Sequence, residues 1–117
     1  MHGAEAAQRA LQPEDLDRIF LERANAGDVD GVVALYELDA VLAVAPGRLA
    51  IGAQAIRLFY SELLAGPPRF IGVIRPAISD GDIAITSTTR GQCHGGGCPR
   101  QPDGTWLWMI DQPNVLE

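Results

Sequence analysis

Apolar residues recur at helical spacing through the first half of the chain. A first helix is predicted from Pro13, which suits a first helical position, to Gly27, a natural helix terminator. Its apolar face repeats every three or four residues and comprises Leu16, Ile19, Phe20 and Ala24. Asp28 can cap a second helix over 29–38 that places Tyr36 on its inner face. A third helix is predicted to begin at Gly52, and its apolar stripe comprises Ile56, Phe59, Tyr60 and Leu63.

The second half of the chain is rich in β-branched residues and turn signals. Two short strands precede the third helix, and longer ones follow it; the predicted ranges are 41–45, 48–51, 69–79, 83–90 and 105–112. Asp80-Gly81 and Pro102-Asp103-Gly104 supply turns between strands. Helices followed by strands favour an α+β fold. We expect one domain over 1–117, with 1–12 as a flexible lead-in.

Composition narrows the classes of function. The chain has 117 residues, 47% hydrophobic and 21% charged, which is typical of a single globular domain. Its net charge of −6 and lack of a basic stripe argue against nucleic-acid and membrane partners. No apolar run is long enough to span a membrane, and 1–11 has no secretory signal pattern, so we expect a cytoplasmic protein. All nine basic residues are arginine, which excludes lysine-based covalent chemistry.

Four segments together resemble one known family. The run LERANAGDVDGVVALY over 21–36 and Asp39-Ala40-Val41 resemble the entries to the second helix and first strand of the nuclear-transport-factor-2-like superfamily. Gly52-Ala53-Gln54-Ala55-Ile56 resembles its third-helix start, and Pro102-Asp103-Gly104-Thr105-Trp106 its turn into the final strand. The superfamily includes ketosteroid isomerase-like and SnoaL-like proteins. The resemblance implies a cone-shaped, curved antiparallel sheet with three helices of the N-terminal half covering one face.

The resemblance also indicates which residues would stand at the catalytic positions of a steroid isomerase. That reaction needs a carboxylate base, and a tyrosine with a protonated acid for the oxyanion. Aligning the Gly27-Asp28 turn puts Phe20 at the tyrosine position and Val44 at the base position. Neither side chain can exchange a proton. We therefore expect no steroid isomerase activity.

Asp111 is the most promising polar candidate for the interior of the cone. Alternation in the last strand puts Leu107, Met109 and Asp111 on one face, which the resemblance turns inward. Asp111 could act as a general acid or base, with His94 as a second catalytic candidate. The more common role of such a carboxylate is structural: it would cap a backbone amide or pair with an arginine such as Arg75 or Arg90. The predicted ligand-contacting residues are Phe20, Tyr36, Val44, Phe59, Tyr60, Ile85, Ser87, Leu107 and Met109.

The segment Cys93-His94-Gly95-Gly96-Gly97-Cys98 allows several interpretations. Two thiols and an imidazole could bind a metal, but the spacing is not a usual zinc pattern. A redox pair or a disulfide is also conceivable, although thiols stay reduced by default in the cytoplasm. We favour a glycine-rich distortion between two strands, and we expect no metal and no cofactor.

The same alternation puts Trp106 and Trp108 on the outer face of the last strand. Two exposed tryptophans would form an apolar patch typical of an interface, and we expect a homodimer through this face. The resulting hypothesis is a homodimeric, SnoaL-like binding protein for an apolar or amphipathic small molecule. The alternatives are an isomerase, cyclase, dehydratase or hydrolase that uses Asp111, and an accessory role in protein–protein contact.

Overall fold

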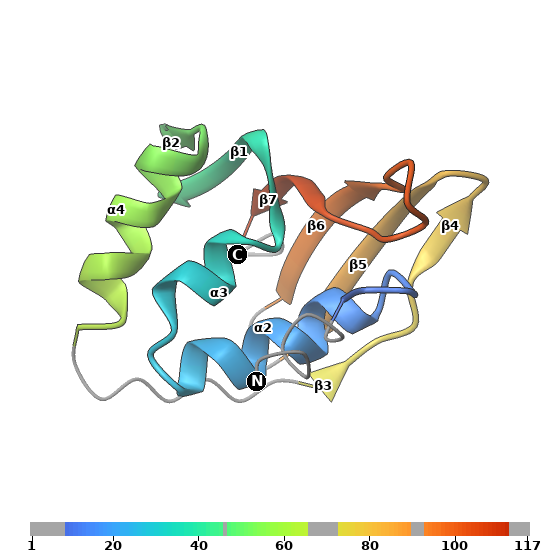
Figure 1. Ribbon diagram of the computed structural model, residues 1–117, viewed down its shortest axis with the longest axis horizontal. Helices are drawn as coiled ribbons and strands as arrows, with labels where there is room; N and C mark the ends of the chain where they lie inside the picture. Colours follow the sequence, from blue (N-terminus) through green and yellow to red (C-terminus); the bar gives the residue numbers. More distant parts are fainter. Residues whose placement is uncertain (1–8, 46, 66–72, 90–92, 113–117) are drawn as a thin grey trace.

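The computed structural model describes residues 9–45, 47–65, 73–89 and 93–112, apart from the side chains at 45, 88, 89, 93–95 and 112. Two helices come first, two strands and a third helix follow, and the second half of the chain forms strands (Figure 1). The elements in chain order are α2 (Asp15–Asn25), α3 (Val29–Val33), β1 (Tyr36–Ala45), β2 (Arg48–Ile51), α4 (Ala53–Leu63), β3 (Val73–Ile74), β4 (Ile78–Asp80), β5 (Ile83–Thr89), β6 (Cys93–Pro99) and β7 (Trp108–Gln112). None of the described helices is long and apolar enough to cross a membrane.

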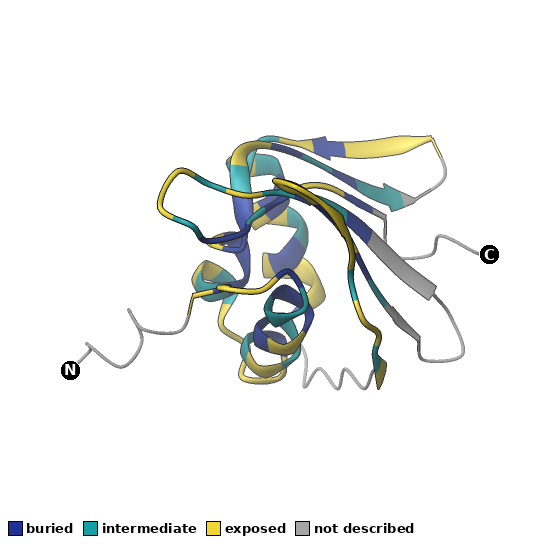
Figure 2. Ribbon diagram, turned by 90° about the vertical axis from the view of Figure 1, so that its right-hand side faces the viewer, coloured by how far each residue is buried: buried dark blue, intermediate teal, exposed yellow. Residues whose placement is uncertain are grey.

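The strands form one curved sheet in the order β2-β1-β7-β6-β5-β3, and β4 also pairs with β5. Every pair is antiparallel except β1 and β7, which run parallel. The strands arch over the helices, which cover one face of the sheet (Figure 2). The predicted α+β class, with helices on one face of a curved sheet, is confirmed.

The local signals for helix ends and turns are confirmed. Gly27 follows α2 with a positive φ of 72°, which glycine adopts without steric cost. The Asp28 side chain caps α3 by accepting a hydrogen bond from the Gly31 N–H. Gly52 precedes α4, and the Asp80-Gly81 turn joins β4 to β5, where Asp80 pairs with Ile83.

Several predicted element boundaries are wrong. The second helix ends at Val33 instead of 38, because Tyr36 already pairs with Trp108 in the sheet. The first helix begins at Asp15, two residues after Pro13. The predicted 69–79 strand is divided into β3 and β4, and 69–72 lie outside the described residues. The predicted flexible lead-in lies outside them up to residue 8, but Ala10 is buried and its carbonyl accepts a hydrogen bond from the Trp106 N–H.

The two tryptophans lie inside the molecule, so their predicted place on the outer face is wrong. Trp106 is 4% exposed and Trp108 is fully buried, whereas Met109, predicted to point inward, is 43% exposed. Simple alternation fails because Met109 and Ile110 are both exposed between the buried Trp108 and Asp111. The register between β1 and β7 also shifts here, between the Tyr36–Trp108 and Val41–Ile110 pairs. An irregularity of this kind turns side chains to the opposite face.

The predicted inward face of β5 is also wrong. Ala84 and Thr86 are buried, whereas Ile85 is 54% exposed and Ser87 is half-buried. The Thr86 hydroxyl accepts a hydrogen bond of 3.0 Å from the Trp108 indole N–H, which holds this register. Thr86 and Ala84 therefore take the inner positions predicted for Ser87 and Ile85.

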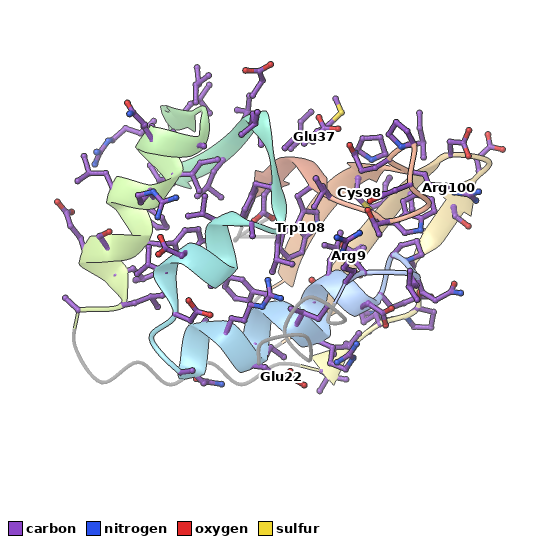
Figure 3. The ribbon with its side chains drawn as sticks, in the orientation of Figure 1. Arg9, Glu22, Glu37, Cys98, Arg100 and Trp108 are labelled. Atoms are coloured by element: carbon purple, nitrogen blue, oxygen red, sulfur yellow. The ribbon has the colours of Figure 1, made fainter. Side chains whose placement is uncertain are left out.

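The glycine segment forms a strand rather than the predicted distortion. β6 pairs with β5 at seven consecutive positions, from Cys93–Thr89 to Pro99–Ile83. The Trp108 side chain of β7 extends over Gly96 to reach Thr86 on β5, so it crosses β6 where no side chain stands. A Cβ atom at Gly96 would lie 2.7 Å from Trp108 Nε1, closer than real contacts allow. Figure 3 labels Trp108 in the space between the sheet and the helices.

Gly96→Ala is therefore expected to lower the free energy of unfolding by about 1–3 kcal/mol, because the indole must move and its bond to Thr86 weakens. Gly97→Ala is the matched control, since a Cβ there meets nothing within 4 Å. The control is expected to be neutral or slightly stabilising. Urea unfolding followed by circular dichroism measures both, and equal effects of the two changes would contradict the packing argument.

Candidate functional site

Five side chains of the predicted site lie in the buried core or pack against it. Tyr36, Tyr60 and Asp111 are buried, and Phe20 and Phe59 are partly buried against the core. Val44 also packs against this core, and Leu107 is half-buried. Of the remaining candidates, the His94 side chain lies outside the described residues.

Asp111 lies in the middle of a buried row that crosses the sheet. Cross-strand partners point to the same face, so the row follows from the pairing of the strands. This inner row comprises Ala50, Leu42, Asp111, Gly96 and Thr86. A carboxylate at the centre of such a row needs hydrogen-bond partners, because an unpaired buried charge is very costly.

Two tyrosines connect Asp111 to the helical layer. Tyr36, at the start of β1, donates a hydrogen bond of 2.5 Å to Asp111 Oδ2. The hydroxyls of Tyr36 and Tyr60 are 2.8 Å apart and hydrogen-bonded, and Tyr60 belongs to α4. The Tyr60–Tyr36–Asp111 chain therefore joins α4, β1 and β7 through buried polar atoms.

Both tyrosines remain neutral in this setting. Burial, and then the charge of Asp111, raise the pKa of Tyr36 well above its usual value. Burial is also the largest cause that raises the pKa of Tyr60, followed by the Asp111 charge. Neither hydroxyl can serve as a tyrosinate base near neutral pH.

Aromatic rings enclose the hydroxyl chain. Phe20 of α2 packs edge-on against both Tyr60 and Trp108, each with ring centroids 6.0 Å apart. Tyr36 packs against Trp108 at 5.2 Å, and Phe59 against Tyr60 at 5.1 Å. The three polar groups are thus set in apolar surroundings, a combination typical of small-molecule sites.

A second buried carboxylate lies outside the hydroxyl chain. Asp17 of α2 is buried, and its charge contributes to raising the pKa of the Cys98 thiol to about 12, although burial is the larger cause. Cys98 is a free thiol on β6 that donates to the Ala84 carbonyl over 3.5 Å. Cys98 is thus not disulfide-bonded in the structure. The alternative of a metal bound by Cys93, His94 and Cys98 includes two side chains, at 93 and 94, that lie outside the described residues. Sequence reasoning missed Asp17, because it counted only the apolar face of this helix.

The outer face of the sheet carries an apolar row in place of the two tryptophans. The strand pairs place its members opposite one another across six strands, and four of its isoleucines are exposed. This outer row comprises Ile51, Val41, Ile110, Gly97, Ile85 and Ile78. The predicted arginine partner Arg75 is exposed, and Arg90 lies outside the described residues.

The sequence matches the SnoaL-like domain family over residues 18–112. The chain therefore belongs to this family, and its resemblance to the nuclear-transport-factor-2-like superfamily is confirmed. No curated protein matches the chain.

Solved structures agree with this fold. A ketosteroid isomerase-like protein from Erwinia carotovora atroseptica is 17% identical, with a TM-score of 0.72 over 100% of this chain and 99% of that one. An NTF2-like protein with a cystatin-like fold from Novosphingobium aromaticivorans is 19% identical, with a TM-score of 0.68 over 89% and 79%. A protein with a cystatin-like fold from Nostoc punctiforme is 17% identical, with a TM-score of 0.68 over 86% and 85%. At these identities the likeness shows the fold alone.

The raised pKa values of Tyr36, Tyr60 and Cys98 predict loss of stability in alkali. Each group keeps its proton in the folded chain above the pH at which the unfolded chain releases it, about 8.5 for cysteine and 10 for tyrosine. Their contribution is thus complete below those values and is lost as pH rises, by about 1.4 kcal/mol per pH unit for each group. The chain has no lysine that would titrate in the same range.

Urea unfolding at pH 8 to 11 measures this slope. Tyr60→Phe should flatten it above about pH 10, and Cys98→Ser from about pH 9. Slopes in both variants equal to that of the unchanged chain would show that these groups titrate alike in the folded and unfolded states.

Proposed function

We propose that this SnoaL-like chain binds a small apolar or amphipathic molecule beside the Tyr60–Tyr36–Asp111 chain. The proposal rests on this hydrogen-bonded series of side chains. Its three polar residues are buried, bonded one to the next, and surrounded by aromatic rings. A core needs no such groups for stability, since well-packed apolar residues often serve as well as buried charges. Apolar walls with a few converging polar groups are what a small ligand requires.

Phe20 and Phe59 give the proposed ligand a route to this chain. Both are partly exposed, and the ring of each contacts the ring of Tyr60. Rotation of either ring would open the buried tyrosine to a molecule arriving from solvent. Phe20 and Val44 take the places of the polar residues of a steroid isomerase, so no steroid isomerase activity is proposed.

Catalysis is the second candidate, and the Asp111 carboxylate favours it. The two tyrosines stay protonated, so Asp111 is the residue of this series that a general acid–base mechanism would use. Asp111 would then act as the acid or base of an isomerase, cyclase, dehydratase or hydrolase, with His94 as the second group. Turnover of a bound molecule that Asp111→Asn abolishes without loss of binding would favour this candidate over simple binding.

The outer row supports the homodimer. Six strands spaced about 4.8 Å apart give an apolar row about 24 Å long, which can form the apolar centre of an interface. The row itself holds no charged residue, so its side chains can pack against a second copy without burying a charge. The occupant that we propose for this face is a second copy of the chain.

Binding is tested by thermal unfolding with naphthalene, 2-naphthol and 2-acetylnaphthalene, and by native mass spectrometry of the purified protein for a retained molecule. A bound probe at 100 times its dissociation constant stabilises the fold by about 2.7 kcal/mol. We expect at least one probe to stabilise the unchanged protein. The stabilisation should change in Asp111→Asn and be retained in Asp17→Asn. Asp17 is the control because it is as buried as Asp111 but is not part of the Tyr60–Tyr36–Asp111 series. If no probe binds and no molecule is retained, the proposed binding function is wrong.

The dimer is tested by size-exclusion chromatography with light scattering. We expect a mass of about twice 12.5 kDa, and a monomer for Ile110→Asp or Ile85→Asp, because a charge would be buried in the apolar interface. Leu58→Asp on α4 is the control, since Leu58 is also exposed but lies away from the sheet. A monomeric unchanged protein at micromolar concentration would contradict the dimer.

A further inference from the structure

The hydrogen bonds of the Tyr60–Tyr36–Asp111 chain run in one direction. We propose that they make Tyr60 a hydrogen-bond acceptor for the ligand, so that the site selects small apolar molecules with a hydroxyl or N–H donor over ketones and ethers of the same shape. This inference rests on the proposed binding function and specifies the ligand class.

The direction follows from a count of protons. A carboxylate has none to donate, and each tyrosine hydroxyl has one. Tyr36 gives its proton to Asp111 Oδ2. The bond between the two hydroxyls must then use the proton of Tyr60, with the Tyr36 oxygen as acceptor. Tyr60 is left with lone pairs only.

Tyr60 is the end of the chain at which a ligand can complete the hydrogen bonding. Within the described part of the protein, its hydroxyl bonds only to Tyr36. Its ring is the one that contacts both partly exposed phenylalanines, Phe20 and Phe59. A molecule that displaces either ring therefore meets Tyr60 before Tyr36, whose hydroxyl is already engaged on both sides.

The preference of Tyr60 for a ligand with a hydrogen-bond donor also has an energetic basis. A donor on the ligand would pair with the Tyr60 oxygen in surroundings that exclude water. A ketone or ether would instead set two acceptors against each other and leave both without a proton, which is costly in a buried site. Sites built to pair with a ligand hydroxyl reject analogues that lack it for this reason.

Asp111 sets the direction from the opposite end. Asp111→Leu removes the acceptor for the Tyr36 proton, and the nearest remaining acceptor is the Tyr60 oxygen. The bond between the tyrosines would then reverse and free the Tyr60 proton for the ligand. This variant should lose its preference for a donor and gain affinity for a ketone.

Three probes of one shape test the proposal by calorimetric titration: 2-naphthol, which has a donor, and 2-methoxynaphthalene and 2-acetylnaphthalene, which have none. We expect the unchanged protein to bind 2-naphthol at least about tenfold more tightly than 2-methoxynaphthalene. Tyr60→Phe keeps the ring and removes the hydroxyl oxygen. In this variant the preference for 2-naphthol over 2-methoxynaphthalene should fall to the value expected from their hydrophobicity alone. In Asp111→Leu, binding of 2-acetylnaphthalene relative to 2-naphthol should increase by about tenfold.

Circular dichroism melting confirms that each variant is folded before titration, and Tyr60→Phe carries the test if Asp111→Leu does not fold. Equal ratios of 2-naphthol to 2-methoxynaphthalene binding in the unchanged protein and in Tyr60→Phe would overturn the inferred direction while leaving the binding function intact. Failure of all three probes to bind would overturn the inferred ligand class. The binding function would be overturned as well if naphthalene also failed to bind and the purified protein retained no molecule.

Discussion

The packing of the Trp108 indole against Gly96 is the contact on which the rest of the inner face depends. The indole crosses one strand to donate to Thr86 on the next, so it fastens β7 to β5 above β6. Tyr36 and Phe20 pack on the same indole, one from β1 and one from α2. The missing Cβ at Gly96 thus lets one side chain join three strands and a helix.

The buried carboxylate of Asp111 imposes the second requirement. It lies at the centre of the inner row, where water cannot solvate it, and Tyr36 supplies a hydrogen bond that offsets part of the cost. Tyr60 then extends the same series of bonds into α4. The groups that make the candidate site polar are therefore also groups that hold α4, β1 and β7 together. Substitutions here are expected to change stability as well as the proposed binding, and a second buried aspartate, Asp17, serves to separate the two effects.

Most of the fold could be predicted from local signals, because they act within a few residues. Gly27, Asp28 and the Asp80-Gly81 turn each fix their element through φ angles or a capping bond. The resemblance to a known family, given by short motifs, added the arrangement of the layers. The orientation of side chains was predicted less well. Strict alternation correctly predicted that Asp111 is buried, but it wrongly predicted that Trp108 is exposed. The irregularity at Met109 and Ile110 depends on pairing with a strand that is distant in the sequence, so no local pattern indicates it. The partnership of Tyr36, Tyr60 and Asp111 spans 75 positions and has no local signature.

The same irregularity in β7 places the residues of the proposed ligand site and those of the proposed dimer face on opposite sides of the sheet. It turns Trp108 and Asp111 to the helices and leaves Ile110 on the outer row. Asp111 thereby lies on the inner face among aromatic rings, and the row at the centre of the outer face holds no charged residue. A regular strand with this sequence would have put an indole on the outer surface and Met109 beside the tyrosines. The proposed ligand site and the proposed dimer face are therefore consequences of one departure from regular β geometry, although they lie on opposite sides of the sheet.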